Sequence, residues 1–177
     1  LVVEAWHLGV RDFGENTAQS LKERAEAFEE RGLAPVRWHM IGGLQRNKAK
    51  VVAPLAYSIH SVDRLELAEA LAKRAPESGL NVLMQVNVGR EPQKSGVDPS
   101  DAAELARSLA GLERLTLKGL MTIPPASGAP DGYFRELRAL FDSLSADAMG
   151  ADFSELSMGM SGDYIEAIGF GATSVRV

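Results

Sequence analysis

The chain has 177 residues, of which 45% are hydrophobic and 24% charged, which is the composition of one ordinary globular domain. Its net charge of −5 argues against a nucleic-acid partner, because a phosphate backbone is normally met by a basic surface. The chain has no cysteine, no apolar run of membrane-spanning length and no metal-ligand spacing among His7, His39 and His60. We therefore expect a cytoplasmic protein without disulfides, a membrane span or a metal site.

Short apolar segments alternate with amphipathic helical patterns along the chain. The helical patterns lie at about 1–8, 21–32, 46–52, 63–74, 98–111, 134–144 and 162–168, and the strand patterns at 13–16, 36–41, 57–60, 82–88, 115–123, 156–158 and 173–177. Strands joined by helices predict an α/β fold with a parallel sheet, either an open doubly wound sheet or a (β/α)8 barrel. Because the pattern starts in a helix and stops after a strand, we expect a first strand and a C-terminal tail to lie outside this chain.

Three helix starts are predicted from capping residues. Asp63 with Glu66 has the spacing of a capping box, and Asp98 before Pro99 has the preferred order of cap residue and first helical residue. Ser161 is the expected cap of the helix at 162–168.

The run Ser157-Met158-Gly159-Met160-Ser161-Gly162-Asp163 is typical of a site for an anion. Exposed N–H groups at a helix start, together with a hydroxyl, can hold a phosphate. The carboxylate of Asp163 could instead take the place of that anion. Arg176 follows on the next strand, where a buried guanidinium needs either a carboxylate of the protein or an acceptor on a ligand.

Further polar residues fall where the predicted strands end, which is where parallel barrels carry their functional groups. Asn16 is either a site residue or only the cap of the following helix, and His39 is either an acid or base or an inward histidine with satisfied hydrogen bonds. His60 is expected to be structural. Arg46, Lys48 and Lys50 are expected to form a solvated polar surface.

An ordered set of motifs resembles a known family. These motifs are Phe13-Gly14-Glu15-Asn16, His39-Met40-Ile41-Gly42-Gly43-Leu44-Gln45-Arg46-Asn47-Lys48, Lys94-Ser95-Gly96, Gly119-Leu120-Met121, the Ser157–Asp163 run and Thr173-Ser174-Val175-Arg176. Together they resemble the pyridoxal phosphate homeostasis proteins, the YggS/PROSC group, whose fold is similar to the N-terminal barrel of alanine racemase. The resemblance implies that residues 1–177 form a single barrel domain, truncated at both ends, that binds pyridoxal 5′-phosphate.

The resemblance also implies roles for particular residues. Ser161 would hold the phosphate, Arg176 would lie against the pyridine nitrogen and Asn16 near the ring, while His39, Met121 and Ser157 complete the expected cofactor-binding set. The family's Schiff-base lysine lies on the first barrel strand, so we expect it upstream of Leu1. No lysine of this chain has the matching context.

The function implied is a carrier that buffers the cofactor and supplies it to pyridoxal-phosphate-dependent acceptor enzymes, with no strong turnover of its own. The alternatives are a pyridoxal-phosphate-dependent amino-acid racemase and a barrel that binds another phosphorylated metabolite.

Overall fold

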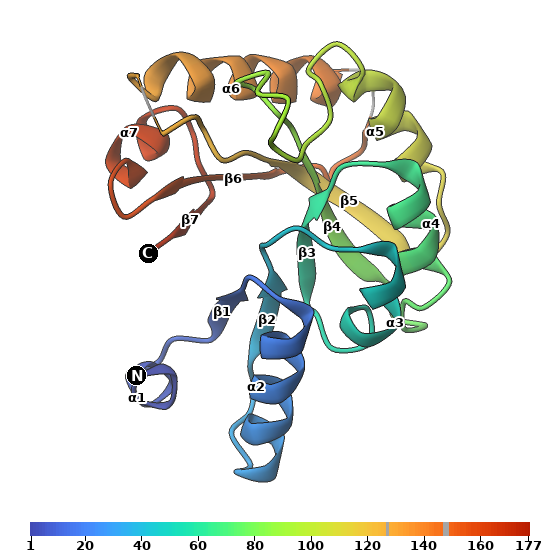
Figure 1. Ribbon diagram of the computed structural model, residues 1–177, viewed down its shortest axis with the longest axis vertical. Helices are drawn as coiled ribbons and strands as arrows, with labels where there is room; N and C mark the ends of the chain where they lie inside the picture. Colours follow the sequence, from blue (N-terminus) through green and yellow to red (C-terminus); the bar gives the residue numbers. More distant parts are fainter. Residues whose placement is uncertain (127, 147–148) are drawn as a thin grey trace.

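Parallel strands form one sheet whose spatial order follows the chain. The computed structural model describes residues 1–126, 128–146 and 149–177. In these ranges seven strands pair in the order β1 to β7, and they are β1 (Asp12–Glu15), β2 (Arg37–Met40), β3 (Ser58–Val62), β4 (Leu80–Gln85), β5 (Leu115–Met121), β6 (Glu155–Met160) and β7 (Ser174–Arg176). A doubly wound sheet reverses its strand order at a switch point, and this sheet does not. The sheet curls into a nearly closed barrel, with β1 and β7 as its two edges (Figure 1).

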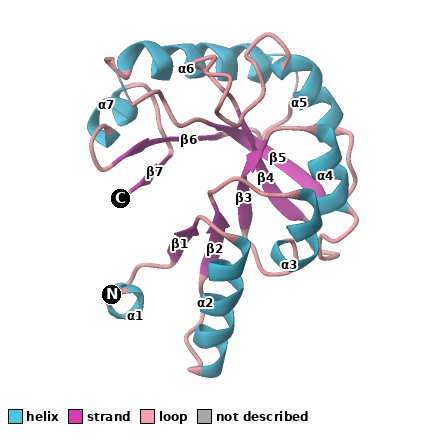
Figure 2. Ribbon diagram, viewed as in Figure 1, coloured by secondary structure: helices cyan, strands magenta, loops and turns pink. Residues whose placement is uncertain are grey.

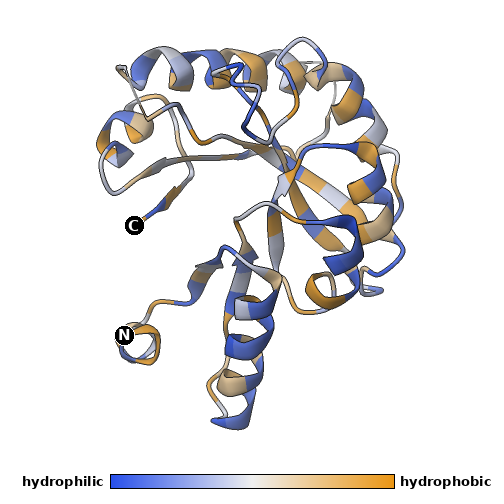
Figure 3. Cartoon of the chain, in the orientation of Figure 1, coloured by the Kyte–Doolittle hydropathy of each residue, from blue (hydrophilic) through white to orange (hydrophobic). Residues whose placement is uncertain are grey.

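Helices cover the outer side of this curl (Figure 2). They are α1 (Val2–His7), α2 (Ala18–Glu30), the short 3-10 helix η1 (Arg46–Lys48) with α3 (Ala49–Val52), α4 (Leu65–Ala72), α5 (Ala102–Ala110), α6 (Asp131–Ala146) and α7 (Tyr164–Gly169). Hydrophobic and hydrophilic residues alternate around the helices (Figure 3), which lets each helix bury one side on the sheet. The predicted parallel barrel is thus confirmed in its seven described strands.

The hydrophobic core lies between the sheet and these helices. On β2 the side chains of Trp38 and Met40 are buried toward α2, where the Trp38 ring contacts the ring of Phe28 at a centroid distance of 5.2 Å. Because successive side chains of a strand point to opposite faces, Arg37 and His39 face the inside of the curl. Burying a large side chain such as Trp38 stabilises the fold by about 2–3 kcal/mol.

The inner face of the sheet is partly polar. Ile59 and Leu156 belong to the outer core, so their neighbours His60 and Ser157 point inward, and both are almost fully buried. Met121 is also fully buried, but it is not part of the helix-packed core. The barrel interior therefore offers a small apolar surface among buried hydrogen-bonding groups.

Two predicted helix starts are wrong because other hydrogen-bond donors engage the two carboxylates expected to cap them. Asp63 accepts a hydrogen bond from the backbone N–H of Gly96 and pairs with Arg64, and α4 begins after Arg64 without a side-chain cap. Asp98 accepts from the backbone N–H and hydroxyl of Ser100, which closes a turn, and α5 begins only at Ala102.

We predict that Gly42 cannot be replaced without loss of stability, whereas its neighbour Gly43 can. A Cβ on Gly42 would lie 2.1 Å from the backbone oxygen of Asn16, so the loop after β1 would have to move. On Gly43 the nearest atom to a Cβ is Ser95 Oγ at 4.0 Å. Urea denaturation should show a loss of about 2 kcal/mol in the free energy of unfolding for Gly42→Ala. The matched Gly43→Ala control should stay within about 0.5 kcal/mol, and equal losses would contradict the prediction.

Candidate functional site

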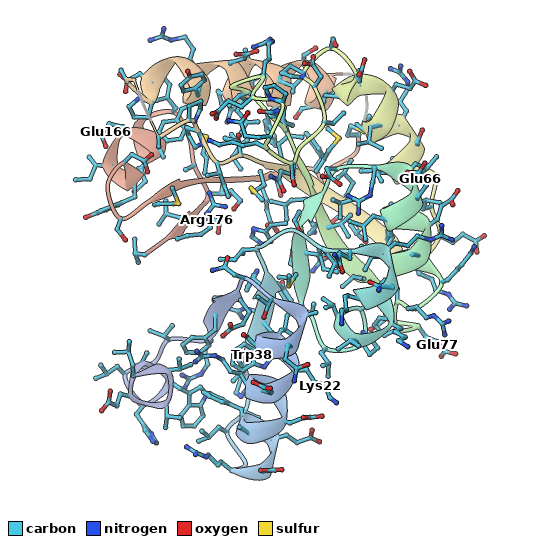
Figure 4. The ribbon with its side chains drawn as sticks, viewed as in Figure 1. Lys22, Trp38, Glu66, Glu77, Glu166 and Arg176 are labelled. Carbon is cyan, nitrogen blue, oxygen red and sulfur yellow. The ribbon has the colours of Figure 1, made fainter. Side chains whose placement is uncertain are left out.

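The register of the last three strands gathers several of the predicted site residues. Met121 is the partner of Ser157 between β5 and β6, and Met160 is the partner of Arg176 between β6 and β7. The Arg176 guanidinium donates from Nη2 to the backbone oxygen of Thr122 at 2.8 Å. Arg176 comes from β7 at the inner side of the curled sheet (Figure 4). The sheet thus brings Met121, Ser157 and Arg176 to one region.

Arg176 is a half-buried cation whose Nε–H is a buried, unused donor among the described residues. Its Nε is buried and makes no hydrogen bond among the described residues. Burial lowers the pKa of Arg176, and the Asp163 carboxylate partly opposes this effect. In the described part of the chain Arg176 has no ion pair within 4.0 Å, so the salt-bridge alternative is wrong there. A buried donor without a partner costs about 1–3 kcal/mol, which an acceptor placed beside it would recover.

The turn from Met160 to Asp163 follows β6 and lies next to Arg176 in the sheet. The Asp163 carboxylate accepts a hydrogen bond from the backbone N–H of Met160 at 2.6 Å. This contact closes the turn, and α7 begins only at Tyr164, with Asp163 as its cap residue and no side-chain cap bond. The prediction that Ser161 caps this helix is therefore wrong, and so is the alternative that Asp163 occupies the first-turn N–H groups. Ser161 is exposed at the tip of the turn.

Asn16 lies directly after β1 and is exposed. The cap of α2 is its neighbour Thr17, whose Oγ1 accepts from the backbone N–H of Ser20 at 3.1 Å. The capping interpretation of Asn16 is therefore wrong. Its backbone packs against Gly42, so this close contact holds the end of β1 beside the turn that follows β2.

A chain of hydrogen bonds runs through the barrel interior and joins His39 to Ser157. His39 Nε2 lies 3.0 Å from Asp12 Oδ1, and His39 Nδ1 lies 3.0 Å from His60 Nε2. His60 Nδ1 in turn lies 2.9 Å from Ser157 Oγ. Asp12 is on β1 and Ser157 on β6, so the chain spans the barrel. His39 is thus an inward histidine with both nitrogens engaged.

The environment of this chain fixes the charges of Asp12 and His60. The Arg37 guanidinium bonds both carboxylate oxygens of Asp12 and, with a smaller contribution from His39, lowers the pKa of Asp12 to about 2. Burial, with smaller contributions from His39 and Arg176, lowers the pKa of His60 to about 3. Asp12 is therefore an anion and His60 a neutral imidazole at neutral pH.

Reasoning from the sequence did not connect Asp12 with His39, or His60 with Ser157. His60 was assigned a structural role, and Asp12 was not singled out because a carboxylate at the start of a strand carries no local signal. Their connection depends on three neighbouring strands and on β6, which lies 97 residues from His60 along the chain.

Other candidate interactions lie outside this region. Arg46 and Lys50 line an open surface groove of about 750 Å³ together with the carboxylates of Glu66 and Glu69, which gives the groove mixed charge. Within the described ranges no group of three or more His, Asp or Glu side chains is placed to hold a metal ion. None of the described helices has the length and hydropathy needed to cross a membrane.

We predict that acid destabilises the protein through His60. Its folded pKa of about 3 lies below the ordinary value of 6.5, so between these values the unfolded chain binds a proton that the folded chain does not. Stability is then lost as the pH falls, by about 1 kcal/mol per pH unit between about pH 6 and 4. Urea denaturation across this range should show a flatter dependence for His60→Gln than for the wild type. His7→Gln, which changes an exposed histidine, should keep the wild-type slope, and an unchanged slope for His60→Gln would count against the assignment.

Comparison with known proteins extends over the whole chain. The family model for the alanine racemase N-terminal domain matches residues 1–177. The chain is 43% identical to the pyridoxal phosphate homeostasis protein of Pseudomonas aeruginosa over 99% of this chain and 75% of that protein. It is 40% identical to the protein of that name from Aquifex aeolicus, over 100% of this chain and 78% of that protein.

Solved structures give the same result. PipY of Synechococcus elongatus, solved without and with pyridoxal phosphate, matches with TM-scores of 0.90 at 35% and 34% identity, over 99% of this chain and 83% of PipY. Alanine racemase of Corynebacterium glutamicum shares the fold, with a TM-score of 0.67 at 14% identity over 93% of this chain and 45% of that enzyme. The chain belongs to the pyridoxal phosphate homeostasis protein family, built on the N-terminal barrel domain of alanine racemase.

Proposed function

We propose that this chain binds pyridoxal 5′-phosphate and holds it for supply to enzymes that depend on it. The observation that carries the proposal is Arg176, whose buried Nε–H has no partner among the described residues and lies beside the exposed turn from Met160 to Asp163. PipY, which has the same fold at 34% identity, has been solved with pyridoxal phosphate bound. Residues 1–177 then act as one cofactor-binding barrel domain.

The phosphate is assigned to the turn after β6. Ser161 is exposed there and offers a hydroxyl donor, and the backbone N–H groups of the same turn are suited to an anion. The carboxylate of Asp163 is bonded to the Met160 N–H, so it leaves the tip of the turn to the ligand.

Arg176 is assigned to the ring nitrogen. When bound, the cofactor supplies an aldehyde that reacts with amines and a pyridine ring that stabilises carbanions best when its nitrogen is protonated. An arginine donates a hydrogen bond to the nitrogen lone pair but keeps its own proton, because its pKa stays far above neutrality. The ring is then a weak electron sink, which favours binding and release over catalysis.

Four further residues complete the proposed site. Met121 offers an apolar surface on the inner face beside Ser157, while Asn16 and His39 approach from β1 and β2. Lys118 is engaged by Asp152, and Lys94 by Glu91 and the backbone oxygen of Pro124. From the resemblance to the family, we place the lysine that bonds the cofactor upstream of Leu1. The receiving partners proposed are pyridoxal-phosphate-dependent enzymes, and the compartment proposed is the cytoplasm.

Replacing Arg176 should weaken cofactor binding. Arg176→Ala removes a charged donor, and hydrogen bonds to charged groups are worth about 1.5–3 kcal/mol, so the dissociation constant should rise about 10- to 100-fold. Fluorescence titration of the natural-length protein with pyridoxal phosphate would measure this change. Arg107→Ala, which removes an exposed arginine on α5, is the matched control and should bind as the wild type does. Equal affinities for the two variants would remove Arg176 from the site.

The carrier function predicts binding without turnover. The natural-length protein should develop a visible absorption band with pyridoxal phosphate, and borohydride should abolish that band. Incubation with L- or D-alanine should leave the chirality of the amino acid unchanged over many protein equivalents. Sustained racemisation would support the racemase instead. Absence of the band would support a barrel for another phosphorylated metabolite.

A further inference from the structure

The hydrogen-bond chain through the barrel has one exposed end and one buried end. The side chain of Asp12 is 51% exposed, that of His39 is 16% exposed, and Ser157 is fully buried. The three contacts are 2.9–3.0 Å long, so each holds one proton between two heavy atoms. The open question is on which atom each proton sits, since this decides what Ser157 offers to the interior.

Asp12, at the exposed end of the chain, fixes the position of the first proton. An ionised carboxylate only accepts hydrogen bonds, so His39 Nε2, which faces Asp12, must carry a proton. The remaining nitrogen of His39, Nδ1, faces Nε2 of His60. Either Nδ1 is bare and accepts from a neutral His60, or it is also protonated and His39 is a cation.

The balance of charge favours the neutral form of His39. The carboxylate of Asp12 is already neutralised by both nitrogens of Arg37 that contact it, and the ring of Tyr57 adds no charge. On the far side Arg176 brings an unpaired positive charge close to His60. A charged His39 would place a further cation between these two arginines, and among the described residues no second carboxylate bonds to this chain of side chains.

We propose that Asp12, held by Arg37, sets the proton positions of both histidines. The hydroxyl of Ser157 then donates its proton to His60 and presents only lone pairs to any ligand group in the barrel interior. The direction is then Ser157 O–H to His60 Nδ1, His60 Nε2–H to His39 Nδ1, and His39 Nε2–H to Asp12. Asp12, His39 and His60 are positioning residues that act through Ser157.

The direction of these hydrogen bonds decides which kind of ligand group Ser157 can bind. A hydroxyl whose proton is already donated can accept a hydrogen bond but cannot donate one. A polar group that reaches Ser157 from the interior must then be an O–H or N–H donor, and phosphate oxygens are excluded from this position. This assignment rests on the proposed function. It gives the two serines of the Ser157–Asp163 run different partners, with the phosphate at Ser161 and a hydrogen-bond donor of the ligand at Ser157.

The proton positions can be measured directly. Long-range proton–nitrogen NMR on nitrogen-15-labelled, natural-length protein without cofactor should show His39 and His60 at neutral pH as neutral rings protonated on Nε2. His39→Gln and His60→Gln assign the signals, and exposed His7 provides a reference in the same spectrum. A proton on His60 Nδ1, or two protons on His39, would overturn the proposal even if no variant folds.

The role of Asp12 needs a variant that changes only the carboxylate. Asp12→Asn is nearly isosteric but offers an N–H donor to His39, so the chain can also run in the opposite direction. The Nδ1 signal of His60 should move toward the protonated position. Asp142→Asn, which changes an exposed carboxylate on α6 that pairs with Arg138, is the matched control and should keep both rings protonated on Nε2. Wild-type signals in Asp12→Asn would show that Asp12 does not set the proton positions.

This experiment is independent of cofactor binding. A protein that fails to bind pyridoxal phosphate would be recognised by absorption and would still give interpretable histidine signals. Failure of the proposed function and failure of the present inference are therefore distinguishable.

Discussion

The hydrogen bond between His60 and Ser157 connects the two halves of the curled sheet. It joins β3 to β6 across the interior, and both side chains are buried. Buried polar groups are costly unless each has a partner, so a sheet with this inner face must curl far enough to bring the two strands together. Two further contacts on the inner face lie near the edges of the sheet. His39 bonds Asp12 on the β1 edge, and Arg176 on the β7 edge bonds the backbone oxygen of Thr122.

Stability and chemistry are placed on opposite faces of the same strands. On β2 the outward Trp38 packs with the aromatic ring of Phe28, while the adjacent His39 faces the interior. The same division separates Leu156 from Ser157 on β6. Because the outer core supplies the apolar burial, the inner face can retain polar groups and the buried donor of Arg176, which would be a poor choice for a core.

Close contacts at the ends of the strands hold the residues of the proposed site in place. Gly42 lets the end of β1 lie against the turn after β2, which brings Asn16 and His39 of the proposed site together from neighbouring strands. At the other edge, the carboxylate of Asp163 closes the turn that carries Ser161 next to Arg176. The proposed anion-binding and ring-binding groups are therefore held by backbone contacts of the strand ends rather than by long flexible loops.

The sequence by itself determined the alternation of strands and helices and, through its ordered motifs, the family, because periodicity and motifs are local properties of the chain. Periodicity alone left an open doubly wound sheet and a barrel both possible, and only the resemblance to the family favoured the barrel. It also indicated that Met121, Ser157, Ser161 and Arg176 belong to strand ends, and the register places three of them on adjacent strands. Their roles toward the cofactor stay predictions.

Only the tertiary structure decided which hydrogen-bond partners these side chains take. Asp63 and Asp163 have the chemistry of helix caps, but their carboxylates bond the N–H groups of Gly96 and Met160 instead. Asp12 carried no local signal, and the sequence could not show which partners His60 has, because the contacts of both residues come from other strands. A side chain with several possible hydrogen-bond partners takes the one that the folded backbone brings closest, and that choice is made only when the sheet curls.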